Sequence, residues 1–256
     1  ITGSIPWNVS NADLSKDGKR LAFVTNENGL SKLYLLSTAT NKYTSAPDIP
    51  VGSIGSLKWF DDSKSLGMTF SSFNSLGDVF EYNTVTGEFI RWTESELGGM
   101  DISNLQEPQL ISWKSFDNRM ISGYYYRASG KFMGKRPVII VIHGGPEGQS
   151  FPEFQGRYNY FLNELGISII YPNVRGSTGY GKTFVDLDND IKREESVKDI
   201  GALIDWIGQH PDLDKDRIMV TGGSYGGYMT LAVSCLYSDK IRCSLNVVGI
   251  SNFNTF

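Results

Sequence analysis

Histidine and cysteine are both scarce in this chain of 256 residues, which contains two of each. Two cysteines provide no disulfide framework, and their spacing resembles no metal site. We expect Cys235 and Cys243 to be free thiols, buried as small apolar residues on a helix and on the strand that follows it. A disulfide between them is the alternative. The sequence indicates neither a metal nor a cofactor.

Long apolar runs and an excess of basic residues are also absent. No run approaches the roughly 20 residues that a helix needs to span a bilayer, so we expect no membrane partner. A formal net charge of −4 disfavours a partner with a phosphate backbone, so we expect no nucleic acid. The chain begins at Ile1 without a methionine or a signal-like segment. We expect a soluble protein, and a cytoplasmic or a periplasmic location stays open.

The first hundred residues contain an internal repeat. Residues 14–23 align with 59–68 at a shift of 45 positions, and residues 37–43 align with 83–89 at a shift of 46. Each copy offers several short strands separated by polar turns, which is typical of propeller blades. We therefore predict that residues 1–100 are the last blades of a β-propeller. Two blades cannot close a ring, so we expect further blades before the start of this chain.

After a Gly-Gly connector, residues 101–256 alternate between strands and helices. A hairpin is predicted over 109–127, with its turn at Asp117 and Asn118. The remaining predicted strands lie at 138–142, 167–171, 217–221 and 245–248, and the helices at 158–165, 196–207 and 228–236. Apolar strands separated by helices indicate an α/β fold with a mostly parallel sheet between helices.

The segment Gly222–Gly227 reads Gly-Gly-Ser-Tyr-Gly-Gly and contains the Gly-x-Ser-x-Gly pattern. In this pattern a serine lies on a sharp turn between a strand and a helix, so we predict Ser224 as a catalytic nucleophile. Its base should be a histidine that follows the serine in the chain. His143 and His210 both precede it, and none of the 32 residues after Ser224 is a histidine. We therefore expect the triad aspartate and histidine beyond residue 256, and no turnover by this chain alone.

The oxyanion donors that acyl transfer requires are predicted from the segment His143–Pro146, which reads His-Gly-Gly-Pro. It follows directly on a predicted apolar strand, as the oxyanion loop of a nucleophile elbow does. We predict the backbone N–H groups of Gly145 and Tyr225 as the two donors. A simple tight turn is the alternative for this segment. His143 itself is interpreted as a structural residue of the loop rather than as the base.

Four motifs in this order resemble the prolyl oligopeptidase family, particularly its acylaminoacyl peptidase and dipeptidyl peptidase branches. They are HGGPEGQ at 143–149, NVRGSTGYG at 173–181, DLDKDRI at 212–218 and GGSYGGYM at 222–229. The resemblance implies a seven-bladed propeller joined to an alpha/beta-hydrolase domain. Residues 101–256 would then be the amino-terminal part of that hydrolase domain.

The family also implies short peptides as substrates, because its propeller restricts entry to the active site. It implies that the loop after the strand at 245–248 helps to form the specificity pocket, with Ile250, Phe253 and Phe256 as candidate substrate-binding residues. Ordinary burial in the core is the alternative for these three. Arg175 and Asp199 are interpreted as structural.

These observations favour a serine peptidase that acts through an acyl-enzyme on Ser224. A noncatalytic interaction module that uses propeller edges is one alternative, and an esterase on the same fold is another. The predicted strand at 245–248 would leave an apolar edge with unpaired backbone groups. We therefore expect the isolated chain to form a homo-oligomer, or its last dozen residues to lack fixed structure.

Overall fold

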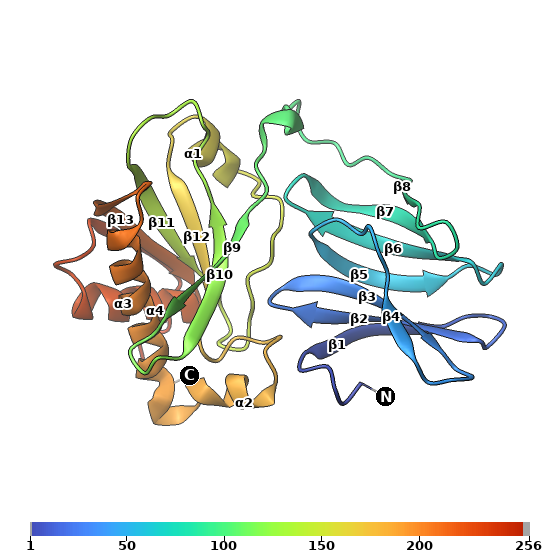
Figure 1. Ribbon diagram of the computed structural model, residues 1–256. Coiled ribbons are helices and arrows are strands. Elements are labelled where there is room, and N and C mark those ends of the chain that lie inside the picture. The colour runs from blue at the N-terminus through green and yellow to red at the C-terminus, as the bar shows by residue number, and fades with distance from the viewer. Residues whose placement is uncertain (1, 253–256) are drawn as a thin grey trace. The chain divides into compact units, whose positions relative to one another are not determined.

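The computed structural model describes residues 2–252 and has the mixed α/β organisation expected from the sequence (Figure 1). It divides into two compact units. Unit 1 comprises residues 1–105, 151–155 and 179–181, and unit 2 comprises residues 106–150, 156–178 and 182–256. Each unit has its own apolar core. The assignment of residues 1–100 to a propeller and of 101–256 to a hydrolase domain stays a prediction.

Unit 1 contains two antiparallel four-stranded sheets, each with its strands in chain order. The first holds β1 (Asn8–Leu14), β2 (Arg20–Glu27), β3 (Leu30–Ser37) and β4 (Tyr43–Ser45), and the second holds β5 (Ser53–Trp59), β6 (Ser65–Ser72), β7 (Ser75–Asn83) and β8 (Phe89–Arg91). The sequence repeat therefore gives a repeated sheet. Asn41 (φ 54°) and Gly87 (φ 77°) occupy the equivalent turn before the fourth strand of each sheet, where a left-handed backbone favours asparagine and glycine.

Unit 2 is built on a six-stranded sheet in the order β14-β13-β11-β12-β10-β9. Its strands are β9 (Gln109–Lys114), β10 (Met120–Tyr126), β11 (Arg136–Ile142), β12 (Ser168–Asn173), β13 (Leu213–Gly223) and β14 (Cys243–Val247). The four strands from β14 to β12 are parallel, as predicted. The predicted hairpin forms β9 and β10 and extends this sheet with antiparallel pairs, so the sheet is mixed.

Helices cover the sheet of unit 2 (Figure 1). They are α1 (Tyr158–Asn163), α3 (Arg193–Gln209) and α4 (Tyr225–Leu236). The short helix α2 (Lys182–Val185) and the 3-10 turns at 186–188 and 190–192 lie between β12 and α3, and a further 3-10 turn lies in unit 1 at 102–104. The apolar face predicted for α3 is confirmed, since Val197, Ile200, Leu203, Ile204 and Ile207 are all buried. The helix ends at Gln209, and His210 caps it before Pro211, because proline cannot continue it.

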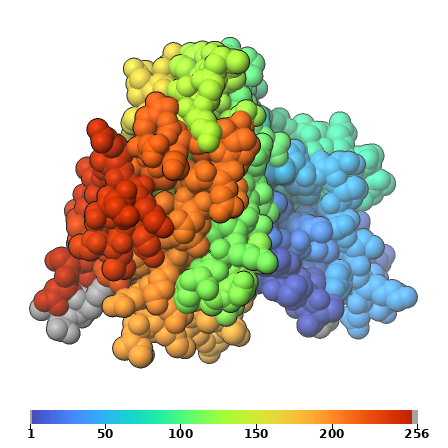
Figure 2. Space-filling view, turned by 60° about the vertical axis from the view of Figure 1, so that its left-hand side comes forward, coloured from blue at the N-terminus to red at the C-terminus, as the bar shows by residue number. Residues whose placement is uncertain are grey.

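The prediction that both cysteines are buried is wrong, although both are free thiols as expected. Cys243 lies on β14, the edge strand, on which every residue is exposed. Cys235 lies near the end of α4 and is exposed as well. Within residues 2–252 no second strand pairs with the outer edge of β14, which is drawn in red at the surface in Figure 2. No helix in this part of the chain is long and apolar enough to cross a membrane.

Candidate active site

Ser224 occupies the turn between β13 and α4 with φ 55° and ψ −117°, a backbone conformation that residues other than glycine rarely adopt. The glycines around it permit this turn. A side chain on Gly226 would collide with the carbonyl oxygen of Ile142, and one on Gly222 would lie 2.5 Å from the oxygen of Gly226. The strand, the helix and the neighbouring strand therefore approach more closely here than any residue with a Cβ atom allows.

The backbone of Ser224 is held on both sides. Its N–H donates to the oxygen of Val247 over 3.1 Å, and its own oxygen accepts from the N–H groups of Tyr228 (3.1 Å) and Ile250 (3.4 Å). The side chain is exposed and does not cap α4. Within residues 2–252 its hydroxyl has no hydrogen-bond partner, so this oxygen is available to a reacting group.

The His-Gly-Gly-Pro loop lies directly against this turn. Parallel pairing of Ile142 with Gly222 ends β11 and β13 at the same level of the sheet, where the loop and the serine turn both begin. A Cβ atom on Gly144 would lie 3.6 Å from the Cβ of Ser224. Gly145 has φ 138°, and a side chain there would press on the backbone of Glu147 and Gly148. The structure thus brings together the two segments from which the oxyanion donors were predicted.

His143 is engaged on both sides of its ring. Nδ1 lies 2.8 Å from the oxygen of Gly144, and Nε2 lies 2.8 Å from the hydroxyl of Ser177. Burial lowers the pKa of His143, and this effect is larger than that of the Gly144 carbonyl, which raises the pKa. A neutral ring has one N–H, which can donate from Nδ1 to Gly144, while the Ser177 hydroxyl beside Nε2 donates to the oxygen of Val174 over 2.6 Å. This arrangement supports the interpretation of His143 as a structural residue of the loop.

The phenol of Tyr225, one residue after the serine, reaches a buried acid that the sequence analysis did not identify. Its hydroxyl donates to Asp188 Oδ2 over 2.6 Å and lies 3.1 Å from the hydroxyl of Ser196. All three residues are at most 1% exposed. Burial raises the pKa of Asp188 to about 6, and the hydrogen bond from Tyr225 offsets only part of that effect. Asp188 lies in an irregular segment between α2 and α3, where no motif drew attention to it.

Arg175 is buried among carboxylates. Its guanidinium donates to both oxygens of Asp199, to Asp117 and to Glu195 over 2.8–3.2 Å. Burial disfavours the charged guanidinium, but the hydrogen bonds of Asp199 and Asp117 outweigh it and raise the pKa of Arg175. With these partners Arg175 joins β12, α3 and the β9–β10 turn, which supports the structural interpretation of Arg175 and Asp199.

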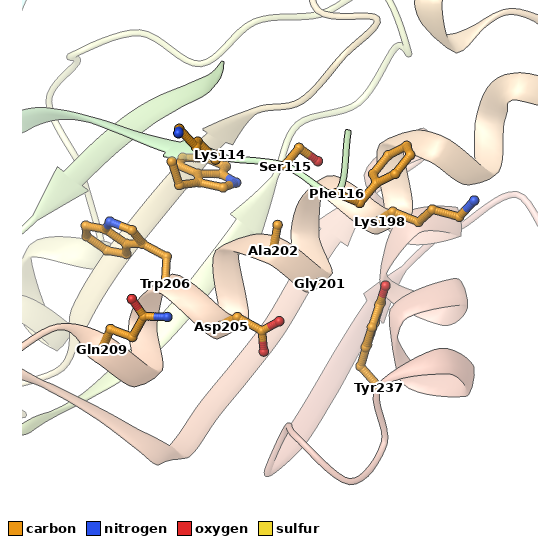
Figure 3. Close-up of a pocket in the computed structure, with 11 residues that line it drawn as sticks. Lys114, Ser115, Phe116, Lys198, Gly201, Ala202, Asp205, Trp206, Gln209 and Tyr237 are labelled. Carbon is orange, nitrogen blue, oxygen red and sulfur yellow. The ribbon is translucent and has the colours of Figure 1, made fainter. Parts of the chain in front are cut away.

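A groove of about 600 Å³ opens between β9 and α3, and Phe116 is one of its lining residues (Figure 3). The Arg175 guanidinium lies 4.5 Å from the centre of the Phe116 ring. Lys198, Asp205, Trp206 and Tyr237 also line it. No residue of the serine turn or of the His-Gly-Gly-Pro loop contributes to this groove. It is therefore a separate feature of the surface of unit 2.

Of the three candidate substrate-binding residues, the structure describes only Ile250. Its side chain is partly buried against the core of unit 2, and its N–H donates to Ser224. Ile250 therefore lies beside the nucleophile turn. Phe253 and Phe256 lie outside the described residues.

Comparison with known proteins agrees with the motifs. Residues 152–256 match the model of the prolyl oligopeptidase family. Dipeptidyl aminopeptidase BIII of Pseudoxanthomonas mexicana is 33% identical over 126 residues, which is 49% of this chain and 18% of that protein. Acylamino-acid-releasing enzyme 1 of Oryza sativa subsp. japonica is 32% identical over 103 residues, which is 40% of this chain and 13% of that protein. The chain thus spans less than a fifth of the length of either relative.

A solved structure of an acylaminoacyl peptidase in complex with Z-Gly-Gly-Phe-chloromethyl ketone superposes with a TM-score of 0.79 at 25% identity. The match covers 100% of this chain and 39% of the solved one. A puromycin-hydrolysing peptidase of Mycobacterium tuberculosis superposes with a TM-score of 0.82 at 22% identity and covers 96% of this chain and 38% of the solved one. Motifs, family model and fold therefore agree, and residues 152–256 are similar to the prolyl oligopeptidase family.

Proposed function

We propose that the protein is a serine peptidase that hydrolyses short peptides of the acylaminoacyl or dipeptidyl type. The position of Ser224 carries this proposal. An exposed serine in a strained turn, with Gly144 packed against its Cβ, has the environment of an activated nucleophile. Relatives named for releasing acylamino acids and dipeptides support the substrate class.

In the proposed reaction Ser224 Oγ attacks the peptide carbonyl, forms an acyl-enzyme and expels the amine, and water then releases the acyl group. The N–H groups of Gly145 and Tyr225 stabilise the oxyanion of both tetrahedral intermediates. A histidine base and its aspartate, expected after residue 256, complete the triad. The seven-bladed propeller, of which residues 1–100 would be the last blades, limits the substrates to short peptides.

Three chromogenic substrates test this function in the protein at its natural length: an acyl-aminoacyl anilide, a dipeptidyl anilide and an aryl ester. We expect hydrolysis of at least one anilide, and loss of about three or more orders of magnitude in Ser224→Ala. A fluorophosphonate probe should label the wild type but not this variant. Ser103→Ala, at an exposed serine of unit 1, is the matched control and should keep both signals.

Each alternative has its own outcome in the same experiment. Hydrolysis of the ester without either anilide would indicate an esterase. Absence of both labelling and turnover in the wild type would favour the noncatalytic interaction module. Turnover by residues 1–256 alone would show that a base other than the expected histidine serves Ser224.

A further inference from the structure

The proposed reaction gives no role to the buried carboxyl of Asp188. Its Oδ2 atom accepts from the phenol of Tyr225, but its Oδ1 atom has no hydrogen-bond partner among the described residues. An ionised carboxylate with one bare oxygen in a buried site is unfavourable, since each oxygen requires donors that water would otherwise supply. The surroundings of Asp188 must therefore favour its neutral form, or the folded state must bear the free-energy cost of burying the ionised form.

The hydroxyl groups around Asp188 can accept the proton of its neutral form and leave only Oδ1 without a donor. The Ser196 hydroxyl donates to the backbone oxygen of Arg193 over 2.7 Å, so its oxygen is left as an acceptor. Tyr225 can then donate to Ser196, and a proton on Asp188 Oδ2 can be donated to the Tyr225 oxygen. In this series of hydrogen bonds the hydroxyls of Ser196 and Tyr225 each donate once and accept once. The unpartnered Oδ1 is then the carbonyl oxygen of an uncharged acid.

Charged and titratable groups face Asp188 from both helices packed against it. On α3, the Arg193 guanidinium lies 5.7 Å from the centre of the Tyr225 ring and favours the ionised form, whereas Asp199 favours the neutral form. On α4, Tyr225 and Tyr228 are the titratable neighbours, and burial raises the pKa of both phenols, so both stay uncharged. Burial of Asp188 exceeds the influence of Arg193 and raises the pKa of its carboxyl to about 6.

The position of Asp188 is also held by the loop that follows β12. A side chain on Gly176 would collide with the Cβ of Asp188, and Gly176 has φ 93°, which favours glycine. Its N–H donates to the oxygen of Phe184 over 3.1 Å, which ties this loop to α2. The carboxyl is therefore presented to Tyr225 by a packed segment rather than by an exposed loop.

We propose that Asp188 is a positioning residue that fastens the Tyr225 phenol and thereby the Tyr225 amide at the start of α4. This inference rests on the proposed function, in which that amide is an oxyanion donor. Tyr225 is the first residue of α4, so its ring and its N–H share one Cα atom. Loss of the phenol contact would allow the first turn of α4 to shift and would misplace the amide next to Ser224.

Substitutions at Asp188 separate positioning from charge. Asp188→Asn is uncharged and can donate to the Tyr225 oxygen, so it imitates the neutral acid. Asp188→Leu removes the hydrogen bond and keeps the branching of the side chain at Cγ. Asp186→Asn, at an exposed aspartate in the same 3-10 turn, is the matched control. We expect Asp188→Leu to lower kcat about 10- to 100-fold with KM changed less than about threefold, because the amide acts in the transition state. Asp188→Asn and the control should stay within about threefold of the wild type.

Thermal unfolding between pH 4 and pH 7.5 tests the neutral form without any substrate. A carboxyl with a raised native pKa binds its proton more tightly in the folded state, so the Tm of the wild type should fall as the pH rises through about 4 to 6. Asp188→Asn has no such proton. The difference in Tm between Asp188→Asn and the wild type should therefore grow over this interval and stay constant above it.

The kinetics and the thermal unfolding test the positioning role and the protonation of Asp188 separately. An unchanged kcat in a folded Asp188→Leu protein overturns the positioning role, and equal losses of kcat in Asp188→Asn and Asp188→Leu below pH 6 overturn the neutral form. A Tm difference that does not depend on pH also overturns the neutral form. If Asp188→Leu does not fold, Tyr225→Phe replaces it, since it removes the hydroxyl and keeps the amide, and an unchanged kcat there overturns the positioning role. A wild type without turnover refutes the proposed function and the catalytic part of this inference, while the Tm series still decides the protonation of Asp188.

Discussion

The imidazole of His143 holds the carbonyl oxygen of the next residue, Gly144, at 2.8 Å from Nδ1. The peptide bond between Gly144 and Gly145 is trans, since the cis bond of this loop is the one between Gly145 and Pro146. In a trans peptide the carbonyl oxygen and the following N–H point in opposite directions. The histidine ring therefore sets the direction of the Gly145 N–H, which is the other donor proposed for the oxyanion.

His143→Ala should lower kcat about 100-fold, with a smaller change in KM, because it releases the peptide that carries one oxyanion donor. Steady-state kinetics on the anilide substrate in the protein at its natural length measures this. His210→Ala is the matched control, since that ring accepts from the N–H of Asp212 and contacts no part of the loop. Equal kinetics in His143→Ala and the wild type would show that the loop keeps its shape without the ring.

Gly226→Ala should disrupt the serine turn, because the added methyl group would meet the backbone oxygen of Ile142 rather than a side chain that can move. We expect a loss of several kcal/mol of folding free energy, or failure to fold. Gly208→Ala is the control, since its Cβ would have only the Cβ of Lys215 nearby at 4.0 Å. This helical position should gain about 0.5–1 kcal/mol. Urea unfolding compares the two, and a tolerated Gly226→Ala would contradict the close packing of β11 and α4.

Arg175→Met should cost about 3–5 kcal/mol, because Asp199 would be left as a fully buried carboxylate without its cationic partner. The control is Arg217→Met, whose ion pair with Asp214 is largely exposed and should contribute less than about 1 kcal/mol. Urea unfolding gives both values. If Asp199→Asn restores the stability of Arg175→Met, the loss arises from the unpaired charge, and a failure to restore it would assign the loss to packing instead.

Unit 1 should lose stability in acid through Asp78. This carboxyl is 1% exposed, and its hydrogen bonds from Ser75, Arg91, Thr93 and Ser95 outweigh burial and lower its pKa to about 2. A lowered pKa means that the stabilisation of about 2 kcal/mol is complete above pH 4 and is lost as the pH falls towards 2. Unfolding followed between pH 2 and pH 5 should show this slope in the wild type and a smaller slope in Asp78→Asn. Equal slopes would assign the acid sensitivity to other carboxylates.

The serine turn could be predicted from the sequence because its glycines are required by local geometry, and local geometry leaves a short motif. The same holds for the apolar face of α3 and for the turns at Asn41 and Gly87. Asp188 could not be found in this way. Its burial depends on Gly176 from one loop and on Tyr225 from another element, so no spacing along the chain reveals it. The exposure of the cysteines was missed because burial was predicted from residue type alone, which does not hold on an edge strand or near the end of a helix.

The pairing of Ile142 with Gly222 determines how far apart the two halves of the site lie. The loop that carries Gly145 and the turn that carries Ser224 each follow directly on a strand. Neither contains additional residues that could compensate for a shift in strand register. A shift of one residue between β11 and β13 would move one half by about 3.3 Å along the strands, more than the length of a hydrogen bond. The backbone hydrogen bonds between these two strands therefore fix the distance between the two halves of the site. An insertion or deletion anywhere inside β11 should abolish turnover even where the sheet still forms.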